Sequence, residues 1–195
     1  MTDAIIDFIS DHGYWAIALL MFVENIFPPI PSELIMPFAG YSAASGDLSL
    51  WGVVAAGVAG SLLGGLPWFL LARRIGSRRV KSLADRHGRW LTVSRDDIER
   101  AERWFQRHGA LVLVLGRLVP GVRTVVAVPA GLAGMGIAPF LAWSTLGAAL
   151  WSALLAGAGY ALESRYESLV HVIDLAAKAV IGLIVVTYVW RVVRG

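Results

Sequence analysis

The sequence predicts an all-α polytopic membrane protein, and three features predict it. Apolar residues make up 57% of the 195 residues and charged residues only 16%, against about 45–50% and about 25% in soluble domains. Three apolar segments are long enough to cross a bilayer, which takes roughly 20 residues. Two more apolar segments are interrupted by charged side chains and by helix-breaking residues. We expect a single membrane domain over residues 1–195.

Residues 1–13 are predicted to form an amphipathic helix that lies at the membrane interface. Asp3, Asp7 and Asp11 recur every four residues, and large apolar side chains fill the positions between them. That spacing places the acids on one face of a helix and the apolar side chains on the other.

Residues 14–45 hold two apolar runs, each too short to cross a bilayer alone. Each proline between them removes a backbone N–H and restricts the residue before it, so the helix has to end there. Non-helical backbone at membrane depth persists only where protein or a wet cavity covers it. We therefore predict a re-entrant hairpin. Its break is formed by Pro28, Pro29 and Pro31, with Glu24 and Glu33 on either side.

Residues 50–72 form the first full-length span, and residues 73–108 are a basic segment. The span is rich in glycine, which permits close packing of helices. The basic segment contains eleven of the 17 Lys and Arg residues. Because it lies between membrane segments, we predict no nucleic acid partner. We interpret it as a cytoplasmic amphipathic helix on anionic lipid, capped by Ser94 and Asp97 and ending at His108.

Residues 109–135 repeat the broken pattern of the first hairpin with the opposite charge. Arg117 and Arg123 flank the dipeptide Pro120-Gly121, and short apolar runs lie on both sides. We predict a second re-entrant hairpin here. The spans 138–161 and 172–190 follow it.

The charges outside the spans predict the orientation. Basic segments stay in the cytoplasm, so the 73–108 segment and the C-terminus are predicted inside and the N-terminus outside the cell (inner) membrane. The first hairpin then enters from outside and the second from the cytoplasm. Hairpin plus span thus occurs twice in opposite orientations, an inverted repeat typical of secondary transporters.

The two predicted breaks carry four charges that balance, on Glu24, Glu33, Arg117 and Arg123. One charge at the centre of a membrane helix costs about 2.5–3.5 kcal/mol, so the four have to pair or face water. Two guanidinium groups suit a lipid phosphate, and the carboxylates suit a coupling proton or Na⁺. The alternative is a dry, static ion-pair lock between the hairpins.

The rest of the sequence gives no reason to expect catalysis. It has no cysteine, four scattered histidines, and neither HExxH nor GxSxG. We predict no catalytic residue, metal or cofactor, and a protein that is not an enzyme. The alternatives to a transporter are a non-transporting membrane-integrity or biogenesis factor and an intramembrane phospholipid enzyme. A homo-oligomer stays open, because glycine-rich spans serve contacts within or between protomers.

The two broken segments resemble the DedA family, also called the SNARE-associated or VTT domain. The resemblance covers about residues 10–160 and is carried by Glu24-Asn25, by residues 28–33 and by residues 116–124. It implies a lipid flippase or scramblase with two opposed re-entrant hairpins. It also implies undecaprenyl phosphate or a phospholipid as substrate, with transport driven by a proton or sodium gradient. The family's essential acids and arginines would be Glu24, Glu33, Arg117 and Arg123.

Overall fold

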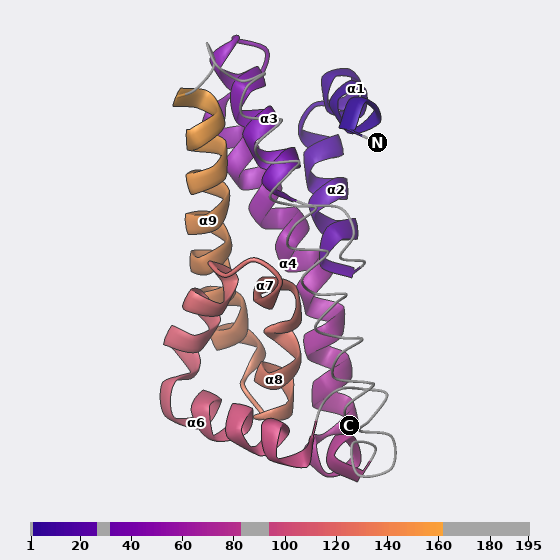
Figure 1. Cartoon of the computed structure of the whole chain (residues 1–195), viewed down its shortest axis with the longest axis vertical. Coiled ribbons are helices and arrows are strands. Elements are labelled where there is room, and N and C mark those ends of the chain that lie inside the picture. The colour runs from indigo at the N-terminus through magenta and orange to yellow at the C-terminus, as the bar shows by residue number, and fades with distance from the viewer. Residues whose placement is uncertain (1, 27–31, 83–93, 162–195) are drawn as a thin grey trace, which may run out of the picture.

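The computed structural model describes residues 2–26, 32–82 and 94–161, and all regular structure in these ranges is helical (Figure 1). The predicted span 172–190 and the three prolines of the first break lie outside them. The helices are α1 (Thr2–His12), α2 (Tyr14–Ile26), α3 (Ser32–Ala44), α4 (Leu50–Ile75), α6 (Arg95–Arg117), α7 (Val122–Val125), α8 (Ala127–Leu132) and α9 (Ile137–Ala161).

Helices α4 and α9 match the predicted spans 50–72 and 138–161, and both are long and apolar enough to cross a membrane. With 26 and 25 residues, they measure about 39 and 37 Å at a rise of about 1.5 Å per residue. The hydrocarbon core of a bilayer is about 30 Å thick. Helices α2 and α3 have 13 residues each, too few to cross it.

The short helices approach the middle of the molecule from opposite ends (Figure 1). Helix α2 descends along α4, and α3 returns along α9. From the other end, the second half of α6 rises along α9, and α8 packs against α4. The end of α2 and the turn between α6 and α7 therefore both lie near mid-height.

Helix α6 is bent, and the predicted amphipathic helix is its first half. Ser94 and Asp97 form the expected capping box, each side chain accepting the other's backbone N–H at 3.1 Å. His108 leaves helical geometry, with φ −136° and ψ 27°. The part before His108 lies across the bundle, and the part after it runs along the bundle (Figure 1).

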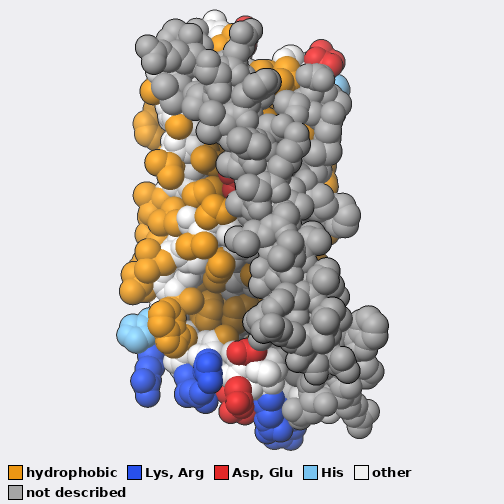
Figure 2. Space-filling model, in the orientation of Figure 1, with side chains coloured by type: hydrophobic (Ala, Val, Ile, Leu, Met, Phe, Trp, Pro, Cys, Tyr) orange, Lys and Arg blue, Asp and Glu red, His pale blue; other side chains and the backbone are white. Residues whose placement is uncertain are grey.

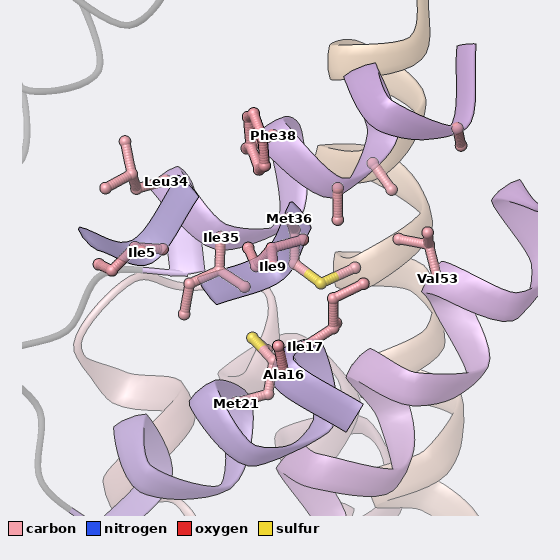
Figure 3. Packing of buried hydrophobic residues seen from close by; sticks show 13 residues of the cluster. Ile5, Ile9, Ala16, Ile17, Met21, Leu34, Ile35, Met36, Phe38 and Val53 are labelled. Carbon is pink, nitrogen blue, oxygen red and sulfur yellow. The ribbon is translucent and has the colours of Figure 1, made fainter. Parts of the chain in front are cut away.

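Two apolar cores hold the two ends together. The first joins α1, α2 and α3 to α4 and α9 (Figure 3). In it, Ile5 and Ile9 of α1 are buried against the protein, so the apolar face of this predicted interfacial helix packs on its own fold. The second core joins α4, α6, α8 and α9, and Phe69 stacks on Phe140 with ring centroids 4.0 Å apart.

The surface has the polarity that a bilayer favours. Leu146, Leu150 and Leu154 form an outward stripe on α9 and are 44%, 47% and 62% exposed. On the coloured part of the face in Figure 2, apolar side chains extend over the height of the molecule, basic ones gather at the α6 end, and acidic ones lie at that end and at the opposite end. In a soluble protein, charged side chains are mostly exposed and large apolar ones are mostly buried. The reverse arrangement here, with buried charges and exposed leucines, indicates a lipid environment.

Candidate functional site

An ion pair joins the two breaks. Glu24, near the end of α2, is 3% exposed, and Arg123 in α7 is 5% exposed. The guanidinium Nη2 of Arg123 pairs with Oε1 of Glu24. The backbone N–H of Ser32, the first residue of α3, donates to the same oxygen at 3.2 Å. A helix N-terminus attracts a carboxylate, so α3 and Arg123 both hold the side chain of Glu24 in place.

Trp151 connects this ion pair to α9. Its indole Nε1–H donates to the hydroxyl of Ser32 at 3.3 Å. Cζ of Arg123 lies 5.7 Å from the centroid of the indole ring, within reach of a cation–π interaction. Neither Trp151 nor Ser32 is among the site residues that the sequence predicts, so their position beside the ion pair is new. One signal in the sequence could have pointed to Trp151. Gly147 precedes it by four residues on α9, and residues four apart lie on the same face of a helix.

Arg117, the last residue of α6, lies in a slot between α4 and α9. A Cβ at Gly65 of α4 would lie 2.9 Å from its Nη2, and a Cβ at Gly147 of α9 would lie 3.0 Å from its Cβ. The missing side chains of these glycines make room for the arginine. Its Nε and Nη2 are buried and have no hydrogen-bond partner within the described ranges.

The contacts with α4 place Arg117 beside the acidic break. Asn25, next to Glu24, packs against Gly64, where a Cβ would lie 2.6 Å from the Cβ of Asn25. Gly64 and Gly65 are neighbours, so the two hairpins contact adjacent positions of one helix. On α9, the positions that contact Arg117 and Arg123 are one turn apart. All of these positions lie near the midpoints of α4 and α9, between the two apolar cores.

Glu33 lies at the edge of this cluster. It is in the first turn of α3, next to Ser32, and is only partly buried. Among the residues that the structure describes, no ion pair involves Glu33. Of the predicted quartet, Glu24 and Arg123 form a buried ion pair, Arg117 is buried between α4 and α9, and Glu33 is only partly buried.

The chain leaves helical structure at residues 118–121, between α6 and α7. Gly121 has φ +78°, a left-handed conformation that glycine adopts without strain, and Pro120 precedes it. The N–H of Val122 donates to the carbonyl of Val119 at 3.1 Å. This turn ends α6 at Arg117 and starts α7, which directs Arg123 inward.

The cluster favours an anion. Glu24 offsets one of the two buried guanidinium groups, so the three charges sum to +1. A buried polar group without a partner costs free energy, and the open N–H groups of Arg117 suit forked hydrogen bonds to a phosphate or carboxylate. No group of three His, Asp or Glu side chains within the described ranges is arranged to hold a metal ion.

Comparisons with known proteins point to one family. The sequence matches the VTT domain over residues 15–161. It is 34% identical to an alkaline phosphatase-like protein of Lactococcus lactis subsp. cremoris over 190 residues, which cover 97% of this chain and 89% of the relative. It is 29% identical over 194 residues to undecaprenyl phosphate transporter A of Staphylococcus aureus, covering 100% and 96% of the two chains.

The transporter A of Bacillus subtilis is 29% identical over 168 residues, 86% of this chain and 81% of the relative. No solved structure matches the chain. The matched range contains both breaks and both long helices, and with them Glu24, Arg117 and Arg123. The chain therefore belongs to the VTT domain (DedA) family of membrane proteins.

Proposed function

We propose that this protein carries a phosphate-bearing lipid, undecaprenyl phosphate or a phospholipid, across the cytoplasmic membrane. Arg117 and Arg123 bind the phosphate, and Glu24 and Glu33 take up a coupling proton or Na⁺. The observation that carries the proposal is the buried guanidinium of Arg117, which has open donors beside an ion pair at mid-height. The names of the Staphylococcus and Bacillus relatives support a polyprenyl phosphate as the lipid.

The arrangement of the helices supports an inverted repeat. Helices α2 and α3, each too short to cross a bilayer, form one unit at one end of the molecule. The second half of α6, with α7 and α8, forms a corresponding unit at the opposite end (Figure 1). We propose that both units are re-entrant and that each works with one long helix, α4 or α9. The basic α6 end then lies in the cytoplasm, and the N-terminus lies outside.

The ion pair suggests how an anion and a cation are coupled. A lipid phosphate that reaches Arg117 competes with Glu24 for Arg123. A carboxylate that loses its cation in a low-dielectric environment takes up a proton. Phosphate binding and proton binding then favour each other, which is coupling by linkage. A sodium ion beside the freed carboxylate would act in the same way.

The test is reconstitution in liposomes that carry fluorescent polyprenyl phosphate or fluorescent phospholipid, with and without a pH gradient. We expect the polyprenyl phosphate to move, and the Glu24→Gln and Glu33→Gln variants to change the pH dependence. Arg103→Lys, on the exposed surface of α6, is the control. If the folded protein moves neither lipid, transport is refuted. If both Gln variants keep the wild-type pH dependence, the proposed coupling is refuted.

The name of the Lactococcus relative favours a second candidate, an enzyme that hydrolyses phosphate esters. Both candidates recognise a phosphate, but only the enzyme releases it. The same liposomes therefore receive an assay for inorganic phosphate. Release above that of protein-free liposomes would favour the enzyme, and lipid movement without release favours the transporter.

A further inference from the structure

A large apolar cavity lies between the first half of α6 and the α7–α8 segment. Its volume is about 740 Å³, within the range of about 300–1,000 Å³ that is typical of ligand sites. Valines of the second hairpin form one wall, and the apolar face of α6 forms the other. The residues that matter here are Ile98, Phe105, Val122, Val125, Val128 and Leu132.

The cavity is apolar along its walls and charged at one edge. Arg100 and Glu102 lie on the α6 side, at the end of the molecule where the charged side chains gather (Figure 2). The rest of the lining is nearly all hydrocarbon. A soluble polar ligand would leave its hydrogen bonds unmade on such walls. A hydrocarbon chain would gain about 25 cal/mol for each Å² that it buries.

The cavity and Arg123 lie on opposite sides of helix α7. Helix α7 is a single turn, and it presents two different faces. Arg123 and Thr124 are buried in the protein, whereas Val122 and Val125, which line the cavity, are 43% and 54% exposed. A lipid headgroup at Arg123 is therefore separated from the cavity by the width of one helical turn.

We infer that this cavity holds the hydrocarbon chain of the transported lipid while its phosphate is at Arg117 and Arg123. The inference rests on the proposed function and adds to it the position of the lipid tail. Val122 and Val125 of the cavity wall share the single turn of α7 with Arg123, whereas the outward leucines of α9 are not next to a charged residue in the sequence.

The experiment uses the full chain in nanodiscs with a polyprenyl monophosphate that carries a photoactivatable diazirine in its chain. We expect crosslinks on residues 122–128 and on residues 98–105, and we expect unlabelled polyprenyl phosphate to reduce them. The variant Val125→Trp fills the cavity, and Leu154→Trp adds the same side chain to the outward stripe as a matched control. Val122→Trp is a second filling variant, and thermal unfolding identifies any variant that fails to fold.

We expect Val125→Trp to lower the competed crosslinking roughly tenfold, because a misfit in an apolar pocket costs about 1–3 kcal/mol, and Leu154→Trp to leave it unchanged. Crosslinks spread equally over Leu146, Leu150 and Leu154, or no competition by the unlabelled lipid, would overturn the inference. If wild-type protein is crosslinked in the cavity but transports no lipid, the cavity assignment stands and the proposed function falls. If transport occurs and both filling variants keep wild-type crosslinking, the cavity assignment falls and the function stands.

Discussion

The two hairpins approach each other at mid-height, but their buried charged side chains differ in how many partners they have. In the acidic hairpin, Oε1 of Glu24 receives the N–H of Ser32 and the guanidinium of Arg123, while its Oε2 is buried without a hydrogen-bond partner in the described ranges. In the basic hairpin, Arg123 has the carboxylate of Glu24 and the ring of Trp151, whereas Nε and Nη2 of Arg117 have no hydrogen-bond partner in the described part of the chain.

This difference separates two roles for residues of the same type. A buried ion pair with further hydrogen bonds fixes the position of the hairpins, and removing one partner leaves an isolated buried charge. An arginine with open donors is ready for a ligand. We therefore expect changes at Arg123 to act on folding as well as on lipid binding, and changes at Arg117 to act on lipid transport with little effect on folding.

The largest expected effect is on stability. Arg123→Ala leaves Glu24 buried without its cation, and we expect a loss of about 3–5 kcal/mol in the free energy of unfolding. The double variant Glu24→Gln with Arg123→Gln should recover part of that loss, because no lone charge remains. Thermal unfolding in detergent measures both, with Arg103→Ala as the exposed control. Equal stability of Arg123→Ala and Arg103→Ala would show that the pair does not join the hairpins.

The next effect is on transport. Arg117→Lys keeps the charge but loses the planar fork that binds two phosphate oxygens. We expect polyprenyl phosphate transport to fall about tenfold, because the loss of one forked contact costs about 1.4 kcal/mol. The unfolding temperature should change little. Flux in liposomes and thermal unfolding are measured on the same preparation. Wild-type flux in Arg117→Lys would favour the static lock of the sequence analysis.

A smaller effect tests the slot that holds Arg117. In Gly65→Ala, the new Cβ would lie 2.9 Å from Nη2 of Arg117, so the guanidinium has to shift by a few tenths of an ångström. We expect transport to fall by a few-fold. Gly157→Ala on α9 is the matched control, because its Cβ would meet no atom within 4 Å. Similar flux in the two variants would separate Arg117 from the substrate path.

The smallest effect concerns the charged end, away from the hairpins. Nζ of Lys81 contacts Glu102 at 2.9 Å and Glu99 at 3.5 Å. The hydrogen bond to Glu102 raises the pKa of Lys81, and the hydrogen bond from Arg95, followed by the charge of Lys81, lowers the pKa of Glu99. The lowered pKa adds stability above the ordinary carboxyl pKa of about 4.3, and that stability is lost as the pH falls through the lowered value.

The raised pKa of Lys81 has the opposite sign. Its contribution is complete below the ordinary lysine pKa of about 10.4 and is lost as the pH rises through the raised value. We expect Glu102→Gln to lower the unfolding temperature slightly at neutral pH and to differ less from wild type as the pH rises through the raised pKa of Lys81. Thermal unfolding from neutral to alkaline pH checks the sign. A difference that grows at alkaline pH would contradict it.

The sequence predicts the helices well because hydrophobicity and capping are local. The length of apolar sequence places α4 and α9, and the pairing of Ser94 with Asp97 places the start of α6. Prolines, Gly121 and the short apolar runs predict a hairpin at each break, and the re-entrant hairpins stay a prediction. The last predicted span lies outside the described residues and stays a prediction.

The partners within the site could not be predicted in the same way. Charge balance indicates that acids and arginines meet, but not that Glu24 selects Arg123 and that Glu33 stays at the edge. Those outcomes depend on which turn of α4 and α9 each hairpin contacts, and helix packing sets that through glycines far apart in the sequence. Trp151 joins the site for the same reason, since hydropathy gives its depth in the membrane but not the direction of its side chain.

The bend at His108 has a consequence for the depth of Arg117. The transverse half of α6 lies at the charged end of the molecule. The nine helical residues from the bend to Arg117 therefore fix the distance of Arg117 from that end. Helices α1 and α2 likewise fix the distance of Glu24 from the opposite end of the molecule. If the two ends lie at opposite membrane faces as proposed, we expect the distance between Glu24 and Arg117 to depend on membrane thickness, so that lipids of different chain length change how closely the two hairpins approach each other.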